Sequence, residues 1–419
     1  MRHLVRVALF LSLIAGSGVL VPAAGAASAP LPGPCRTSTL PHGALALACV
    51  PASGWNGDLV VFAHGYTAFN QPLAFQNLTL PDGTTSLPTL AQSLGFAFAT
   101  TSYRENGLAI LPGLDDIREL VAAFRAAHGI PAHTYLVGAS EGGLITTLLV
   151  ERSPRLFSGG LAACGPIGDF RQQIDYIGDF RVLFDYFFPG VLPGSPIDVP
   201  RALIDQWDQT YVPAIRAALA ANPSAAQQLI ATAKAAIDPA DPTSIVTTTL
   251  DVLWYAVFSA DDASRKLGGN PYGNRDRWYW GSSDDLRLNL GVRRFTADAR
   301  AVANLAPYQT TGAVTIPLVT VHTTGDDVIP FWNELLYAGK AHPSGHGSVV
   351  QLPIFRYRHC NFTTTDLLFG FGLLVWQASA QTLPGGAPAA GLQQAQRDFD
   401  RANATAQRPA AAPPGPSAS

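Results

Sequence analysis

Charged side chains are scarce in this chain of 419 residues, where Asp, Glu, Lys and Arg together make up 14%. The 27 Lys and Arg against 30 Asp and Glu leave a net charge of -3, and no basic run or stripe occurs. A surface that binds nucleic acid needs clustered positive charge. The sequence therefore predicts no nucleic-acid partner.

Long apolar runs are also rare, and a membrane-spanning helix takes about 20 such residues. At the N-terminus, Arg2 and Arg6 precede an apolar stretch over 7–21, and Ala24-Gly-Ala follows it. This is the pattern of a secretory signal peptide. We therefore predict a signal peptide over 1–26, no stable membrane anchor, and a secreted protein, extracellular or periplasmic. An uncleaved anchor is the alternative.

Cysteine is limited to four residues, and export places them where disulfides persist. Cys35 and Cys49 flank a segment with the pattern of a β-hairpin, so we predict a bridge between them. By elimination, Cys164 pairs with Cys360, although two buried free thiols are the alternative. The second bridge would fix the loop that carries His359, which directly precedes Cys360.

Apolar residues make up 47% of the chain and aromatic residues 10%, which is enough for a large core. Short, nearly continuous apolar runs alternate with helical patterns such as 115–128, as in a parallel sheet covered on both faces. We therefore predict an α/β fold with a mostly parallel sheet. The expected strands are 47–50, 59–63, 96–102, 135–137, 159–163, 316–321 and 349–352.

The strand pattern is interrupted for about 150 residues before 316, and we interpret this insertion as a cap with helices at 200–219 and 225–237. Its aromatic cluster serves either binding or packing. The cluster consists of Phe184, Tyr186, Phe187 and Phe188. The predicted organisation is core over 27–165, cap over 166–310, core over 311–383 and a disordered Ala/Pro-rich tail over 384–419.

A G-x-S-x-G segment, Gly138 to Gly142, lies between an expected strand and an expected helix. Such a turn raises a serine hydroxyl above the sheet, and glycine on either side avoids side-chain clashes. The pentapeptide alone does not distinguish a nucleophile from an ordinary loop. Because a strand precedes it and a helix follows, Ser140 is the predicted nucleophile.

A serine nucleophile needs a base, and the base needs a carboxylate that holds its tautomer. Asp326 follows an expected strand and is our choice for the carboxylate, with Asp327 as the alternative. A purely structural role for this segment would be an Asx turn that caps the following helix. His359 follows the last expected strand and is the predicted base. The order Ser140, Asp326, His359 along the chain is that of α/β-hydrolases.

Backbone N–H groups must stabilise the oxyanion of the tetrahedral intermediate. The amides of Tyr66 and Glu141 are the predicted donors, one in the loop after a strand and the other at the start of the helix after Ser140. A metal site of His64, His322 and Asp326 is conceivable, but no metal-binding spacing supports it. We therefore expect no metal and no cofactor.

These elements together resemble the α/β-hydrolase superfamily over about residues 45–380. Residues 64–68 (His-Gly-Tyr-Thr-Ala) are similar to the oxyanion loop of bacterial cutinase-like polyester hydrolases, and 358–360 (Arg-His-Cys) look like the histidine loop of tannases and feruloyl esterases. The tannase pattern has a cysteine before the serine, where this chain has Ala139. The resemblance implies the α/β-hydrolase fold with a mainly helical cap and an activity like that of secreted serine esterases or lipases.

The first functional hypothesis is a secreted carboxylic-ester hydrolase with a Ser-His-Asp triad, acting on small-molecule or polymeric esters. The second is an exported serine peptidase, aminopeptidase-like, whose cap carboxylates bind a substrate amine. Candidates for that role are Asp261, Asp262, Asp284 and Asp285. A third is a non-catalytic binding protein that keeps the fold. The sequence defines neither the acyl group nor the oligomeric state, because specificity lies in the cap.

Overall fold

The structure, a computed structural model, describes residues 32–380. Its centre is one eight-stranded sheet in the order β1-β2-β4-β3-β5-β6-β7-β8. Strand β2 is antiparallel to β1 and β4, and the other pairs are parallel. The strands are β1 (Cys35–Thr39), β2 (Leu45–Cys49), β3 (Leu59–Ala63), β4 (Ala97–Thr101), β5 (Thr134–Ala139), β6 (Gly159–Ala163), β7 (Pro317–Gly325) and β8 (Ser348–Tyr357). The predicted α/β class with a mostly parallel sheet is confirmed.

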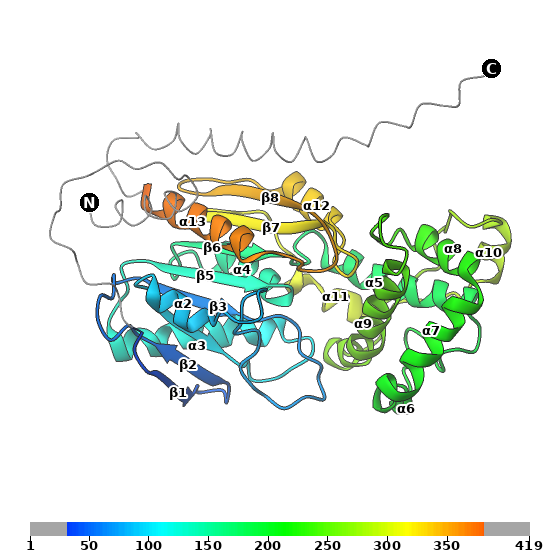
Figure 1. Cartoon of the computed structure of the whole chain (residues 1–419), viewed down its shortest axis with the longest axis horizontal. Helices are drawn as coiled ribbons and strands as arrows, with labels where there is room; N and C mark the ends of the chain where they lie inside the picture. Colours follow the sequence, from blue (N-terminus) through cyan, green and yellow to red (C-terminus); the bar gives the residue numbers. More distant parts are fainter. Residues whose placement is uncertain (1–31, 381–419) are drawn as a thin grey trace, which may run out of the picture.

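Helices cover both faces of the sheet, which explains why the inner strands are apolar along their whole length. Side chains that alternate along a strand face opposite layers. On β3, Leu59 and Val61 pack with α3 (Ile110–His128) and α4 (Glu141–Arg152), whereas Val60 and Phe62 pack with α2 (Leu87–Ser93) and α13 (Thr364–Ala380). Figure 1 shows this layered arrangement, with α12 (Trp332–Lys340) near β7 and β8.

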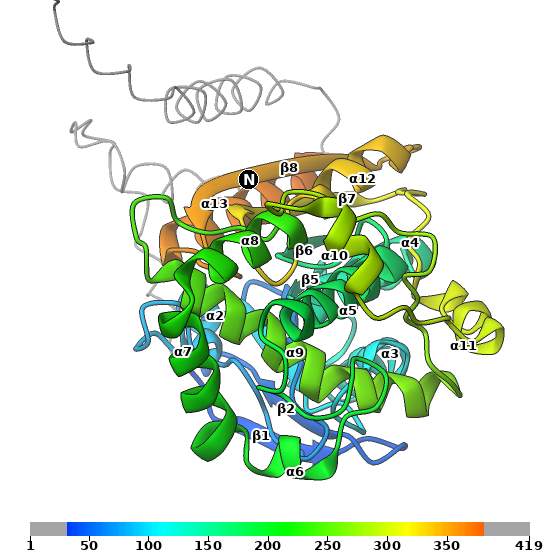
Figure 2. The same cartoon turned by 90° about the vertical axis from the view of Figure 1, so that its right-hand side faces the viewer.

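Most of the chain between β6 and β7 is helical, as Figures 1 and 2 show. It has a hydrophobic cluster of its own. Its longest helices, α5 and α9, pack against each other and against α8. The helices are α5 (Phe170–Phe187), α6 (Arg201–Asp205), a π-helical turn (Trp207–Tyr211), α7 (Val212–Ala221), α8 (Pro223–Ala233), α9 (Ser244–Leu267), α10 (Asp285–Gly291) and α11 (Ala299–Ala303). The predicted bounds of core and cap remain predictions.

The helical pattern predicted over 200–219 is confirmed, but as three successive elements, α6, the π-helical turn and α7, instead of one helix. Pro213 lies in the first turn of α7, and proline has no N–H to continue the hydrogen-bond ladder of a preceding helix. The helix predicted over 225–237 begins earlier, at Pro223, where the Asn222 side chain caps the N-terminus. It ends earlier as well, at Lys234 in left-handed conformation.

Both predicted disulfides are present. Cys35–Cys49 joins β1 to β2, where the two residues are paired in register. Cys164–Cys360 joins the residue after β6 to the loop after β8. The predicted signal peptide over 1–26 and the predicted tail over 384–419 lie outside the described residues. Within the described part of the chain, no helix has the length and apolar character needed to cross a membrane.

Candidate active site

Ser140 occupies the sharp turn between β5 and α4, with a φ of 57°. A residue other than glycine rarely adopts such a left-handed backbone conformation, so the surrounding structure must hold Ser140 in it. A Cβ at Gly138 would collide with the carbonyl oxygen of Gly142, and a Cβ at Gly142 would collide with that of Ala63. Glycine at both positions therefore allows the turn to pass closely beside β3, which leaves Ser140 at the end of β5.

His359 links Ser140 to Asp326 through hydrogen bonds. Its Nε2 lies 3.0 Å from Ser140 Oγ, and its Nδ1 lies 2.8 Å from Asp326 Oδ2. Asp326 directly follows β7, and His359 lies in the loop after β8, so neighbouring strands place both groups at one edge of the sheet. The structure thus brings together the three residues that the sequence singled out, in the geometry that serine activation requires.

The two neighbouring aspartates have different partners. Asp326 Oδ1 accepts hydrogen bonds from the amides of Val328 and Ile329, and its Oδ2 faces the His359 ring. Asp327 instead accepts the backbone amide of His359. Burial alone would raise the pKa of Asp326, but the charge of His359 and hydrogen bonds with it and with His322 hold that pKa well below its usual range. Burial and the charge of Asp326 raise the pKa of Asp327 to about 6.

His322 is a site residue to which sequence reasoning gave no role in the triad. It is buried beside Asp326, with Nε2 at 2.8 Å from the carbonyl oxygen of Ile329 and 3.3 Å from Asp326 Oδ2. Its Nδ1 lies 3.2 Å from Glu334 Oε1. Burial lowers the pKa of His322, but hydrogen bonds to Asp326 and Glu334 outweigh burial and raise it to about 10. Because each ring nitrogen faces an acceptor, the imidazolium form fits this site.

The Cys164–Cys360 disulfide lies directly beside the catalytic histidine candidate. On both sides of His359 the backbone is left-handed, with φ 86° at Arg358 and 50° at Cys360. Such a loop needs external support to keep one conformation. The bridge supplies it by tying Cys360 to Cys164, whose amide donates to the carbonyl oxygen of Val321 in β7.

The loop after β3 runs beside Ser140, because a Cβ at Gly65 would lie 3.2 Å from Ser140 Cβ. Tyr66, the next residue, borders the same cavities as Ser140. Its hydroxyl donates to the carbonyl oxygen of Phe258 in α9, which anchors the loop to the cap. Glu141 begins α4, where amides have no partner within the helix. The Tyr66 and Glu141 amides remain our candidates for the oxyanion hole.

The Glu141 side chain is buried, and its Oε1 accepts a hydrogen bond from the amide of Ala109. Its Oε2 is also buried and has no hydrogen-bond partner among the described residues. Burial raises the pKa of Glu141 to about 8, against the opposing hydrogen bond from Ala109. A carboxyl group with that pKa is mostly neutral at pH 7 and can donate a hydrogen bond.

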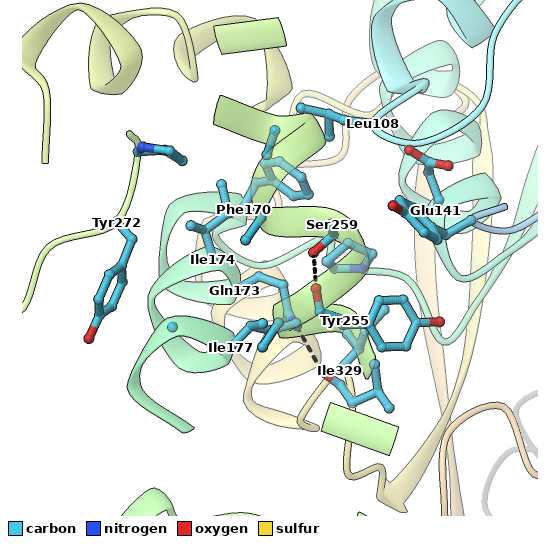
Figure 3. Close-up of a pocket in the computed structure, with 18 of the residues that line it drawn as sticks. Leu108, Glu141, Phe170, Gln173, Ile174, Ile177, Tyr255, Ser259, Tyr272 and Ile329 are labelled. Carbon is cyan, nitrogen blue, oxygen red and sulfur yellow. Dashed lines mark hydrogen bonds between the residues drawn. The ribbon is translucent and has the colours of Figure 1, made fainter. Parts of the chain in front are cut away.

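Two cavities meet at Ser140. The first, here called the cap-side cavity, has a volume of about 120 Å³ and lies between α5, α9 and Ser140. Figure 3 shows residues of its lining, among them Phe170, Ile174 and Ile177 of α5 and Tyr255 of α9. The second, the sheet-side cavity, has a volume of about 440 Å³ and lies between the sheet, α2 and α13. Both are mostly apolar around the candidate nucleophile.

A third, more open recess borders His359 on the side of α9. It is lined by Asp251, Trp254, Tyr255, Val328, Arg358, His359, Cys360 and Asn361. Because polar and charged side chains contribute to this lining, the His359 ring has access to a hydrated surface as well as to the sheet-side cavity. A leaving group near His359 therefore has a direct route to solvent.

The four cap aspartates considered for amine binding do not line the cavities described here. Asp262 accepts the amide of Leu108 and pairs with Lys266. Asp284 and Asp285 accept amide hydrogen bonds at the start of α10 and in the preceding turn. The rings of the aromatic cluster serve to pack the cap: Phe184 and Phe188 are buried in its hydrophobic cluster, and Tyr186 and Phe187 pack against that cluster.

The conceivable metal site of His64, His322 and Asp326 is not formed within residues 32–380. His64 stacks on Tyr103, with ring centroids 4.0 Å apart, and hydrogen-bonds to the carbonyl oxygen of Gly65. In that part of the chain, the one group with ligand atoms close enough to hold an ion is Cys164, His359 and Cys360. Its two sulfurs are joined in the disulfide, whereas a metal needs thiolates.

No family model and no curated protein matches this sequence. Solved structures resemble it, among them an acylaminoacyl peptidase of Pyrococcus horikoshii (12% identity, TM-score 0.41, covering 85% of this chain and 42% of that one). Others are oligopeptidase B of Trypanosoma brucei (11%, 0.42, 84% and 38%) and an esterase of Pyrococcus furiosus (10%, 0.39, 87% and 98%). The chain thus spans less than half the length of those two peptidases.

Three features of the chain itself define its fold. The strand order places β5 at the centre of a mostly parallel sheet, and β5 leads through a left-handed turn at Ser140 into α4. The acid follows a later strand, and the histidine follows the last one. With a serine at the strand-to-helix turn and the order Ser140, Asp326, His359, this chain has the α/β-hydrolase fold.

Proposed function

We propose that this chain is an exported serine hydrolase that cleaves carboxylic esters through an acyl-enzyme intermediate. The observation that carries the proposal is the continuous hydrogen-bonded chain from Ser140 through His359 to Asp326. A serine hydroxyl becomes a nucleophile when a positioned base takes its proton as attack proceeds. This arrangement provides the base and the carboxylate that orients it.

In the proposed reaction, Ser140 Oγ attacks the ester carbonyl carbon while its proton passes to His359 Nε2. The amides of Tyr66 and Glu141 stabilise the oxyanion, each by about 3 kcal/mol. His359 then donates the proton to the leaving alcohol, and the acyl group stays on Ser140. Water, deprotonated by His359, releases the acid. Asp326 keeps Nε2 facing Ser140 and stabilises the imidazolium.

An ester is preferred over a peptide because the groups around Ser140 are mainly apolar. An aminopeptidase needs an anion that binds the substrate amine. The cap aspartates proposed for this role have other partners, as at Asp262. Glu141 is the carboxyl group at the cap-side cavity, and its pKa of about 8 favours the neutral form at pH 7. Glu141 is therefore better suited to hydrogen-bond an ester oxygen than to bind an ammonium.

Purified protein tested on p-nitrophenyl acyl esters and on aminoacyl p-nitroanilides separates these activities. We expect ester turnover to dominate, and dominant amide turnover would favour the peptidase. Ser140→Ala should abolish turnover and leave the melting temperature close to that of the wild type. Full activity in this variant would show that another residue is the nucleophile. No turnover of either substrate class by the wild type would favour a binding protein that keeps the fold.

Export is supported by the N-terminal sequence pattern and by the two disulfides. The full-length chain expressed in a secreting bacterial host should appear outside the cytoplasm with a new N-terminus at Ala27. N-terminal sequencing of the recovered protein measures this directly. Recovery of the uncleaved chain from the membrane fraction would instead identify the apolar stretch over 7–21 as an anchor.

A further inference from the structure

The sheet-side cavity has an apolar floor formed by one face of the sheet. Side chains on that face recur at every second residue along four neighbouring strands, as the pleat requires. They are Phe98 of β4 and Phe96 just before it, Val60 and Phe62 of β3, Val137 and Ala139 of β5, and Leu161 and Ala163 of β6. Val137 is only half-buried even though β5 is a central strand with neighbours on both sides. The sheet is therefore not completely covered at this point.

Helices α2 and α13 and the loop before α2 complete the cavity. Their contributions are almost entirely aliphatic or aromatic: Leu80, Pro81, Leu87, Leu90, Ala91 and Leu94 on one side, and Phe362, Leu367, Leu368 and Phe371 on the other. Apart from the residues at its mouth, the polar side chains in the lining belong to Asn77 and Thr79. Such a cavity excludes charged or strongly hydrated groups and favours a hydrocarbon.

The cavity opens at the reacting groups. Ser140 and His359 both line it, together with Gly65 and Tyr66 of the candidate oxyanion loop. From Ser140 the lining extends down the sheet to Phe96, directly before Ala97 at the start of β4. Ala97 and Thr134, the first residue of β5, are both in register with Leu59 of β3 and so lie at the same level of the sheet. At about 3.3 Å per residue this distance is about 20 Å, enough for an extended chain of roughly 12 to 16 carbons.

We propose that the sheet-side cavity binds the long hydrocarbon chain of an acyl group, so that the preferred substrates are long-chain fatty acyl esters. This inference rests on the proposed ester hydrolysis. The acyl carbon is the one that bonds to Ser140, at the mouth of the cavity. The alcohol must leave beside His359, and the open recess lined by Trp254, Arg358 and Asn361 gives it a polar route to solvent.

Turnover of p-nitrophenyl esters with acyl chains from acetate to palmitate tests the proposal. Each buried methylene should raise kcat/KM by up to about fourfold until the cavity is filled. A series of alkyl acetates, in which the alcohol lengthens instead, should show a weaker dependence. A chain-length dependence found in the alcohol series alone would overturn the assignment to the acyl group.

Ala91→Phe fills the cavity from the α2 side, and Val137→Phe fills it from the floor close to Ser140. Both should lower the ratio of palmitate to butyrate ester turnover at least tenfold. Thr89→Phe adds the same bulk on the exposed side of α2 and is the matched control, with an unchanged ratio. If either cavity variant folds, as judged by its melting curve, and keeps the wild-type ratio, the proposal is wrong.

A binding measurement separates this inference from the proposed function. In calorimetry, Ser140→Ala should bind sodium palmitate and not sodium acetate, and Val137→Phe introduced into that variant should weaken palmitate binding at least tenfold. Acetate ester turnover without palmitate binding would refute the acyl cavity and leave the esterase intact. Palmitate binding without turnover of any ester would refute the esterase and retain the cavity.

Discussion

His322 Nε2 lies 3.3 Å from Asp326 Oδ2, the oxygen that is hydrogen-bonded to the His359 ring. On its other side, His322 contacts Glu334 of α12 through Nδ1, and Glu334 in turn accepts the hydroxyl of Thr320 and the side-chain amide of Gln351. The candidate triad therefore continues as a buried ionic chain into the sheet and α12. We infer that His322 positions Asp326 and stabilises its charge.

His322→Gln should lower kcat at least tenfold with little change in KM, because Asp326 loses the cation that supports its charge. Breaking a buried pair of this kind also costs about 3–5 kcal/mol in the free energy of unfolding. Initial-rate ester assays measure the loss in kcat, and thermal melts measure the loss in stability. His342→Gln, at an exposed histidine, is the control and should change neither. Unaltered kcat in a folded His322→Gln protein would exclude the positioning role.

The same histidine predicts a pH dependence of stability. The folded-state pKa of His322, about 10, is above the unfolded value of about 6.5, so its contribution is complete below pH 6.5 and is lost as the pH rises to about 10. The wild type should therefore lose more stability than His322→Gln between pH 7 and pH 10. Denaturant unfolding of both proteins at each pH measures the difference. Parallel pH curves would show that His322 is neutral in the folded state.

Asp326 and Asp327 should differ sharply on replacement by asparagine. Asp326→Asn should lower kcat by about 10⁴, since an amide cannot hold the required histidine tautomer. Asp327→Asn should cost less than tenfold, because the asparagine oxygen can still accept the backbone amide of His359. The comparison uses kcat at saturating ester for both variants. A larger loss in Asp327→Asn would reverse the two assignments.

The sequence was sufficient to place Ser140, Asp326 and His359. Each of them follows a strand that is recognisable from its run of apolar residues, and parallel strands bring their carboxyl ends to one edge of the sheet. It could not reveal the pairing of His322 with Glu334. That contact depends on how α12 packs against β7, and no local pattern encodes this. For the same reason the sheet-side cavity was not predicted: its lining is drawn from distant elements, and its apolar side chains look like ordinary core residues in sequence.

The disulfide beside His359 should matter for catalysis, whereas the one in the β1–β2 hairpin should not. Replacing Cys164 and Cys360 by alanine frees the strained loop after β8, and a displacement of about 1 Å can cost about 10² in rate. The same change at Cys35 and Cys49 is the matched control and should leave kcat/KM within about twofold of the wild type. Equal losses in both double variants would indicate a general folding defect.

Glu141→Gln should stabilise the protein at alkaline pH. Burial raises the folded-state pKa of Glu141 to about 8, above its ordinary value of 4.5, so the folded protein retains a proton that the unfolded chain has lost. The wild type therefore loses stability as the pH rises from 4.5 to 8.

The Glu141→Gln variant keeps the acceptor for the Ala109 amide without the buried charge. Its melting temperature should exceed that of the wild type by several degrees at pH 9 and by much less at pH 5. Asp208→Asn, at an exposed carboxylate, should show no such difference. A variant with equal or lower stability than the wild type at pH 9 would mean that Glu141 is ionised and has a compensating partner.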